Sequence, residues 1–358
     1  MKCKLSDICE YRKGKVNTSN LTLKTYISTE NMLPDKAGVV EANSLPSTRL
    51  VQEYKEHDTL VSNIRPYFKK IWQAKHDGGC SNDVLVFQGK ANVDKDFLYY
   101  ILANDDFFAY SMATSKGTKM PRGDKKSIMQ YELQLFDIKI QKKIVSILKL
   151  LDKKIELNNA INNNLEQQAI AIFDNMFPNI YTAEKTIGDI IIPKRGKSLL
   201  SKNAIFGSVP VVAGGLNPST YHNTANTVAP VLSISASGAN AGYVSLWTMP
   251  IWSSDSSFID SSMSNDVYFW YVLLKKRQNE IYDSQTGSAQ PHIYPQHIAA
   301  MPICDLNFNK VSNYTSTVTP IFELIGHNKI ENMRLITIRD TLVPKLISGD
   351  LDVSNISL

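Results

Sequence analysis

Three short segments within the first 122 residues combine basic, hydroxyl and amide side chains, two of them around a glycine. The members are Arg12, Lys13, Lys15, Ser62, Asn63, Arg65, Lys69, Lys116, Thr118, Lys119 and Arg122. Lys and Arg form ion pairs with phosphates, while Arg, Asn, Ser and Thr also hydrogen-bond the edges of nucleobases. Gly14 and Gly117 would let the backbone approach a duplex closely. Arg65 is the best single candidate for a bidentate contact with guanine or phosphate.

A second set of the same chemistry occurs after residue 190. It comprises Lys194, Arg195, Lys197, Ser235, Ser237, Gln285, Thr286, Ser288, Gln290 and His292. No Lys or Arg occurs from Asn203 to Leu274, so basic contacts in this half must come from the flanks of that stretch. Gln can pair with adenine through two hydrogen bonds, and Ser or Thr with either partner of a base pair. For every residue of both sets, an ordinary solvated surface is the alternative interpretation.

Motifs for catalysis and for metal binding are absent from the sequence. An adenine methyltransferase needs an Asn/Asp-Pro-Pro-aromatic motif for the flipped base, and a nucleotide-binding loop needs GxxxxGK[ST]; neither occurs. The four cysteines are Cys3, Cys9, Cys80 and Cys304, which have no zinc-ligand spacing. We therefore predict no catalytic residue, no metal and no cofactor.

The sequence is an approximate internal duplication, which suggests two similar domains. The segment 5–8 (LSDI) is echoed by 187–190 (IGDI), and 59–62 (TLVS) by 230–233 (PVLS). The segment 80–83 (CSND) is echoed by 252–255 (WSSD), and 117–121 (GTKMP) by 287–291 (GSAQP). Four matches in the same order indicate a repeat rather than coincidence.

Length and composition agree with two globular domains. The chain has 358 residues, of which 43% are hydrophobic and 20% charged, as in ordinary globular proteins. Each half mixes expected strands (84–87 and 228–234) with expected helices (97–108 and 267–276). We expect an α+β fold of two repeated α/β domains. No apolar run approaches a membrane span and no signal peptide is recognisable, so a cytoplasmic location is expected.

Two long helical segments follow the two halves. No Pro or Gly interrupts residues 138–176, which would form a helix about 55–60 Å long that ends at Pro178. We expect the second to begin near Pro320 and to be kinked or ended by Pro344. A stripe at spacings of three and four predicts that they pair antiparallel as a coiled coil. The pairing residues would be Ile144, Leu148, Leu151, Ile155, Asn158, Leu165, Ile325, Asn332, Leu335 and Leu342.

This organisation predicts four parts: a first recognition domain (1–136), a first helix (137–178), a second recognition domain (179–315) and a second helix with a tail (316–358). Since a DNA turn advances about 34–36 Å, two domains on such helices could read a target split into two half-sites.

Several segments resemble the specificity subunits of type I restriction-modification enzymes. The most specific is 338–351 (IRDTLVPKLISGDL); others are 60–66 (LVSNIRP) with 81–83 (SND), 117–121 (GTKMP) and the helix 141–177. The usual Pro-x-x-Glu-Gln start of that helix is reduced here to Gln141.

The resemblance implies a non-catalytic subunit in which each target-recognition domain reads half of a bipartite sequence in double-stranded DNA. It also implies an antiparallel coiled coil, two docked methyltransferase subunits, and endonuclease/translocase subunits for restriction. Two other classes remain as alternatives: a coiled-coil adaptor that binds protein, and a self-contained methyltransferase. Salt-dependent binding to duplex DNA would separate the first from a DNA reader, and methyl transfer by the isolated chain would reveal the second.

Overall fold

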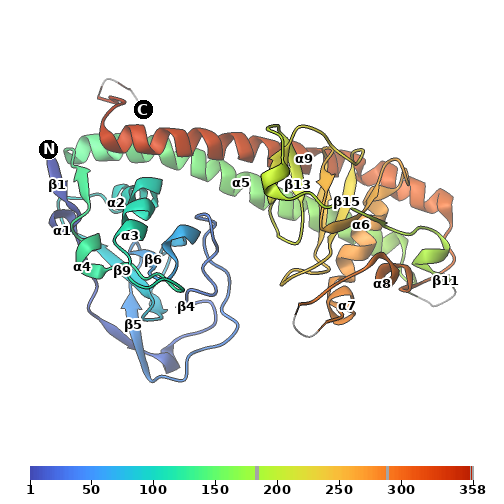
Figure 1. Cartoon of the computed structure of the whole chain (residues 1–358), viewed down its shortest axis with the longest axis horizontal. Coiled ribbons are helices and arrows are strands. Elements are labelled where there is room, and N and C mark those ends of the chain that lie inside the picture. Colours follow the sequence, from blue (N-terminus) through green and yellow to red (C-terminus); the bar gives the residue numbers. More distant parts are fainter. Residues whose placement is uncertain (182–184, 288–289, 355, 357–358) are drawn as a thin grey trace. The chain divides into compact units, whose positions relative to one another are not determined.

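The computed structural model describes residues 1–181, 185–287, 290–354 and 356, which form two compact units (Figure 1). Unit 1 consists of Met1–Ile155 and Met333–Leu358, and unit 2 of Glu156–Asn332. Two long helices, α5 (Ile138–Met176) and α9 (Phe308–Ser348), contribute to both units. The four-part division made from the sequence stays a prediction.

Unit 1 contains two four-stranded sheets, ordered β2-β9-β6-β7 and β3-β5-β8-β4, and the small pair β1-β10. Its strands are β1 (Lys2–Lys4), β2 (Cys9–Tyr11), β3 (Lys15–Asn17), β4 (Tyr26–Ile27), β5 (Leu50–Tyr54), β6 (Thr59–Ser62), β7 (Ile71–Gln73), β8 (Gly78–Cys80), β9 (Val84–Gly89) and β10 (Glu132–Gln134). Its helices are α1 (Leu5–Ile8), α2 (Lys95–Ala103), α3 (Asp105–Ala113) and α4 (Lys125–Ile128), with 3-10 turns at Thr18–Asn20 and Pro66–Phe68.

Unit 2 repeats the first of these sheets in the order β12-β18-β15-β16 and adds β14-β13-β17 and the pair β11-β19. Its strands are β11 (Lys185–Thr186), β12 (Lys194–Arg195), β13 (Val209–Val212), β14 (Thr220–His222), β15 (Val231–Ser235), β16 (Val244–Trp247), β17 (Trp252–Ser253), β18 (Ser256–Asp260) and β19 (Pro302–Ile303). Its helices are α6 (Val267–Lys276), α7 (Gln278–Asp283) and α8 (Pro295–Ala299), with 3-10 turns at Ile187–Asp189 and Ser201–Asn203.

The two units start with the same local construction, which confirms the repeat at its first motif. In unit 1 the Lys4 amide donates to the Asp7 carboxylate at 2.7 Å, and in unit 2 the Thr186 amide donates to Asp189 at 2.8 Å. A short strand directly precedes α1 in unit 1 and the 3-10 turn Ile187–Asp189 in unit 2. Each of these strands pairs antiparallel with a strand late in the same unit, β1 with β10 and β11 with β19. The fold is therefore α+β and duplicated, as expected.

The expected helix over 97–108 is two helices, because Asn104 interrupts it. Asn104 has extended backbone angles (φ −66°, ψ 140°), ends α2 and begins α3. Its side chain accepts a hydrogen bond from the Asp106 amide at 3.4 Å, as an N-terminal cap does. The expected helix over 267–276 agrees with α6.

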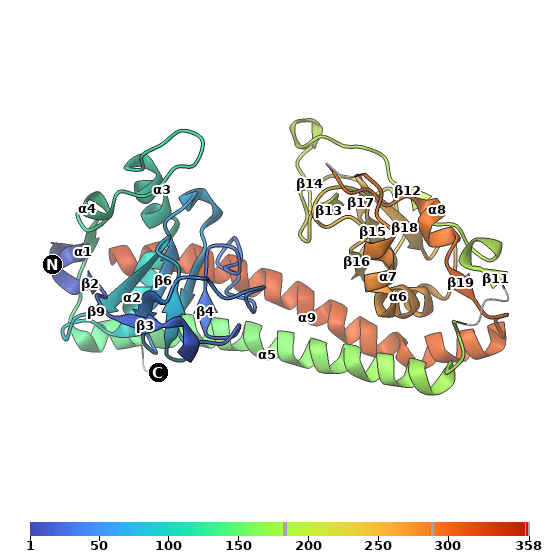
Figure 2. The same ribbon diagram turned by 90° about the horizontal axis from the view of Figure 1, so that it is seen from below.

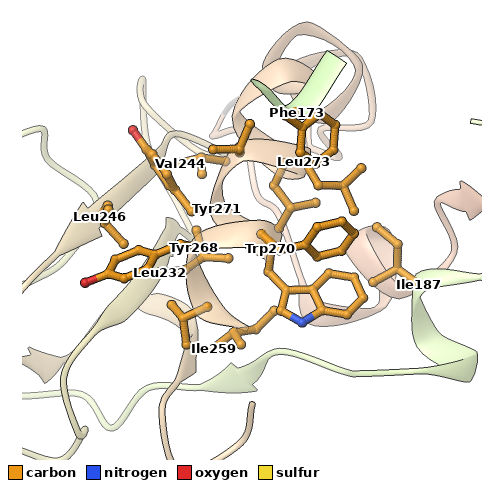
Figure 3. Close-up of a cluster of buried hydrophobic side chains, with 14 of the residues drawn as sticks. Phe173, Ile187, Leu232, Val244, Leu246, Ile259, Tyr268, Trp270, Tyr271 and Leu273 are labelled. Carbon is orange, nitrogen blue, oxygen red and sulfur yellow. The ribbon is translucent and has the colours of Figure 1, made fainter. Parts of the chain in front are cut away.

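Helix α6 forms the centre of the unit 2 core (Figure 3). All residues from Val267 to Leu274 are buried, because the sheet packs on one face of the helix and the long helices on another. Phe173 of α5 packs against Phe269 with ring centroids 5.6 Å apart. In unit 1 the corresponding core joins α2 and α3 to both long helices through residues such as Leu148 and Leu346. The long helices are thus part of both cores.

Within each unit the two long helices pair antiparallel, which confirms the expected coiled coil (Figure 2). In unit 2 the Asn158 side-chain amide donates to Asn332 at 2.9 Å and the Asn328 side-chain amide donates to Asn162 at 2.8 Å, while in unit 1 the Arg339 guanidinium donates to Asp152 at 2.8 Å. The residue number on α9 therefore falls as that on α5 rises. None of the ten predicted pairing residues is exposed.

Helix α9 begins at Phe308, upstream of Pro320 where the sequence suggested a start. The Asn307 side chain accepts from the Lys310 amide at 3.2 Å and caps this end. Pro344 does not end the helix, which runs on to Ser348 and stops before Gly349. Gly349 has φ +86°, the left-handed conformation that commonly terminates helices. None of the helices in the described residues has the length and apolar character that crossing a membrane requires.

Candidate DNA interface

Three segments that are distant in the sequence of unit 1 meet beyond the end of β6. The Asn63 amide donates to the Asp83 carbonyl at 2.8 Å, and the Arg65 amide donates to the Pro121 carbonyl at 2.8 Å. The Arg122 guanidinium lies 3.2 Å from the Asp83 carboxylate. Residues 62–65, 81–83 and 116–123 therefore form one surface, which we call the loop junction of unit 1.

The third segment of this junction is a tight loop that presents its tip to solvent. Lys116 and Arg122 exchange two backbone hydrogen bonds of 2.8 and 2.9 Å, and Gly117 turns the chain at φ +92°. Thr118 and Lys119 at the tip are exposed. The Lys116 ammonium lies 2.6 Å from the Asp124 carboxylate, and this bond keeps the pKa of that carboxyl far below its usual range. Hydroxyl and ammonium groups thus project from a fixed base.

Unit 2 builds the same junction with different side chains. The Ala236 amide donates to the Asp255 carbonyl at 3.1 Å, and the Gly238 amide donates to the Pro291 carbonyl at 3.1 Å. Thr286 and His292 exchange two backbone bonds, as Lys116 and Arg122 do in unit 1. We call this the loop junction of unit 2; it comprises the described residues of 235–238, 253–255 and 286–293.

The shared hydrogen bonds correct the alignment of the repeat. Ser62 of β6 faces Val84, and Ser235 of β15 faces Ser256. Ser62 therefore corresponds to Ser235, whereas the sequence comparison matched it with Ser233. The error is two residues, one full strand period, so it leaves the inward and outward faces unchanged.

The comparisons with known proteins agree with this architecture. A protein-family model for the type I restriction modification DNA specificity domain matches residues 1–167. A type I restriction enzyme MjaIX specificity subunit from Methanocaldococcus jannaschii is 25% identical over 75% of this chain and 71% of its own length. The HindI specificity subunit from Haemophilus influenzae is 28% identical over 48% of this chain and 41% of its own.

A crystal structure of the type I restriction-modification system S subunit from M. genitalium shares the fold. Its TM-score is 0.56 at 18% identity, and the match covers 99% of this chain and 96% of that one. Residues 1–167 therefore match the type I restriction modification DNA specificity domain, and the whole chain has the fold of a type I restriction-modification S subunit. The family model reaches only residue 167, and the repeated hydrogen bonds extend the same fold to unit 2.

In unit 1, the predicted contact residues fall into two groups. Lys13, Lys15, Lys116, Thr118, Lys119 and Arg122 are exposed, whereas Arg12, Ser62, Asn63, Arg65 and Lys69 are at least partly buried. The Arg12 guanidinium is paired with Asp58, with one bond of 2.9 Å, and this hydrogen bonding raises the pKa of Arg12. Lys69 is paired with Asp105 at 2.8 Å. Both side chains therefore have a structural partner within the unit.

In unit 2 the exposed members are Lys194, Arg195, Lys197, Thr286 and Gln290, while Ser288 lies outside the described residues. Arg195 lies 2.6 Å from the Asp255 carboxylate, which also accepts a hydrogen bond from Ser237. Gln285 donates to the Ala241 carbonyl at 2.7 Å, so its amide is used inside the unit. His292 stacks on Tyr294 with an interplanar angle of 17°.

Sequence reasoning missed Asp83 and Asp255 as site residues, although both stood in the repeated motif. Each carboxylate pairs with a basic side chain: Asp83 with Arg122 of the same junction, and Asp255 with Arg195 of β12, outside the unit 2 junction. Because Asp83 and Asp255 both end the same repeated motif, 80–83 and 252–255, the sequence could have identified them as candidate site residues. Among the residues that the structure describes, no three His, Cys, Asp or Glu side chains are grouped as a metal site would require.

Proposed function

We propose that the chain is a type I restriction-modification specificity subunit that reads a split DNA target, with one half-site recognised by each loop junction. The observation that carries the proposal is the repetition of the same four backbone hydrogen bonds in both units, while the side chains around them differ. Two loop junctions with the same backbone hydrogen bonds but different side chains could each recognise a different DNA sequence.

Exposed basic side chains in both units support this assignment. Lys13, Lys15 and Lys119 are exposed in unit 1, and Lys194 and Lys197 are exposed in unit 2. Such ammonium groups bind phosphates, and hydroxyl and amide groups beside them can contact base edges. In unit 2, the basic residues come from the flank of the long stretch without Lys or Arg, as the sequence required.

We further propose that the subunit itself does no chemistry and that two methyltransferase subunits dock on the region of the paired helices, with endonuclease/translocase subunits joining for restriction. The presence of two similar units supports two equivalent docking surfaces. Native mass spectrometry of the assembled complex would measure the number of copies. A saturated complex with a single methyltransferase copy would contradict equivalent docking.

Exchange of one reader tests independent reading. Residues 180–305 lie between the end of α5 and the start of α9, so replacing them with the same region of a relative leaves both long helices intact. Methylome sequencing of cells with the complete system should then show one altered half-site and one unchanged. The matched control exchanges residues 1–136 and should alter the other half-site. If either exchange changes both half-sites, the readers are not independent.

The alternative function is a coiled-coil adaptor for proteins, for which the paired helices are the supporting observation. A DNA reader loses affinity steeply as salt rises, because phosphate contacts release counterions. Titration of the full chain with duplex DNA at several salt concentrations separates the two functions: an adaptor shows no such salt-dependent binding.

A further inference from the structure

Arg65 has a backbone conformation that its counterpart in unit 2 leaves to glycine. Arg65 has φ +50° and ψ 65°, and Gly238 has φ +82°; each amide donates to the carbonyl of the matching proline, Pro121 or Pro291. The left-handed region is unfavourable for a residue with a Cβ atom, whereas glycine enters it freely. Unit 1 therefore has an arginine at a position where glycine would adopt the same backbone conformation with less strain.

The guanidinium of Arg65 has no partner in the described part of the chain. Its Nε is buried without a hydrogen bond, and so is the Asn63 Oδ1 two residues earlier. Neither terminal nitrogen of Arg65 forms a hydrogen bond or ion pair, and neither is among the buried unpaired atoms. These two nitrogens therefore reach solvent from a side chain whose base is enclosed by the protein.

This arrangement is a pair of donors held in place before any ligand arrives. A planar fork of two N–H groups matches the O6 and N7 acceptors of guanine in the major groove, and it also matches two phosphate oxygens. Lys119, at the tip of the same loop junction, is exposed and can bind a phosphate. The enclosed base of Arg65 and its place where the three segments meet favour the nucleobase.

We propose that Arg65 is a specificity-determining residue that reads one guanine in the half-site of unit 1, and that its strained backbone is retained for this contact. The proposal rests on the DNA-reading function proposed above. Unit 2 has no side chain at the equivalent Gly238, so its half-site is not read from that position. The equivalent positions, Arg65 and Gly238, therefore contribute differently to recognition of the two half-sites.

The test is selection of bound sequences from a random duplex pool by the full chain, followed by sequencing. The wild type should enrich a motif containing a guanine whose preference disappears in Arg65→Gly. The preference at that one base pair should fall about ten- to a hundredfold, with the other positions unchanged. Arg65→Lys keeps the charge but not the fork, so it should lose the same preference.

A second readout tests the strain. Because glycine relieves the left-handed conformation, Arg65→Gly should raise the melting temperature by about 2–4 °C while it removes base discrimination. His57→Gly is the matched control: His57 also has positive φ (+71°) but lies in the turn before β6, away from the loop junction. It should show a similar thermal gain with an unchanged motif.

Each contrary result has a distinct meaning. A uniform loss of affinity in Arg65→Gly, with the motif kept, would make Arg65 a phosphate contact and overturn the proposal. An unchanged motif and affinity would overturn it as well, and a lower melting temperature would refute the strain. If the wild type enriches no motif and binds no duplex, the DNA-reading function itself fails, which is a different outcome from a failure at Arg65 alone.

Discussion

Asn158 of α5 and Asn332 of α9 face each other inside the helix pair of unit 2, and Asn158 Nδ2 donates to Asn332 Oδ1 at 2.9 Å. Both side chains are buried, and Asn332 in turn donates to Asn159 at 2.9 Å. Buried polar pairs cost stability relative to an apolar core but favour one alignment of the helices over others.

The first prediction concerns this pair. Asn158→Ala removes the donor and leaves the Asn332 oxygen buried and unpaired, so unfolding in urea should become easier by about 1–3 kcal/mol. Replacing both Asn158 and Asn332 by Leu removes both polar groups and should cost less than the single change. Asn164→Ala, on an exposed position of the same helix, is the control and should have little effect. A double leucine variant with a lower free energy of unfolding than Asn158→Ala would contradict this account.

The second prediction concerns Asp152, which connects α2 to the helix pair in unit 1. Its carboxylate accepts hydrogen bonds from the Tyr100 hydroxyl at 2.5 Å and from Arg339 at 2.8 Å. Burial, followed by the Asp152 charge, raises the pKa of Tyr100, so the hydroxyl stays a donor at neutral pH. Asp152→Asn should lower the free energy of unfolding by about 1–3 kcal/mol, because the partly buried Arg339 loses one of its two carboxylate partners and keeps only Asp340.

The control for Asp152 is an ion pair in the same unit whose basic side chain is exposed. Lys149 lies 2.5 Å from Asp96, and its side chain is 53% exposed, so Lys149→Ala should cost at most about 1 kcal/mol. Equal losses in the two variants, measured by urea unfolding, would mean that burial adds nothing to the Asp152 contacts.

The third prediction is the salt dependence of DNA binding. Lys119 is exposed at the tip of the unit 1 loop junction, so Lys119→Gln should reduce the slope of log K against log salt by about one. The base preferences should not change, since a phosphate contact carries no sequence information. Lys153→Gln, on an exposed face of α5, is the control. A shift in the recognised motif would make Lys119 a base contact.

The fourth prediction concerns the cysteine thiols. Burial raises the pKa of both Cys9 and Cys80 to about 12, because the thiolate is poorly solvated there. At pH 8 the reactive thiolate is therefore about a thousandfold scarcer than in an unfolded chain. Iodoacetamide should label Cys9 and Cys80 slowly until urea unfolds the protein, and label the partly buried Cys304 earlier. Rapid labelling of Cys80 in the native state would show that its enclosure opens.

Periodicity predicted the helices well because they bury one face continuously. It placed α6 correctly, and none of the ten positions that it predicted for helix pairing is exposed. It failed at Asn104 and at Pro320, where the choice between continuing and ending a helix depends on caps and tertiary packing. Local rules for Asn and Pro cannot decide such cases.

The candidate site was predictable in its chemistry but not in its geometry. The sequence pointed to Arg65, Lys119 and the repeated motifs, yet nothing in it says that Asn63 bonds to Asp83 or Arg65 to Pro121. Nor could it reveal that Arg12 already has Asp58 as a partner, 46 residues away. Such pairings are set by strand order, which short motifs do not determine.

Unit 2 is one continuous stretch, Glu156–Asn332, whereas unit 1 needs residues from both sides of it. The unit 1 core includes Leu346, Ile347 and Val353. On the ribosome, residues 1–155 therefore emerge first but cannot complete their core until the last segment has been made. The part synthesised first is the last to finish folding, and its apolar helix face stays uncovered for as long as the rest of the chain takes to translate.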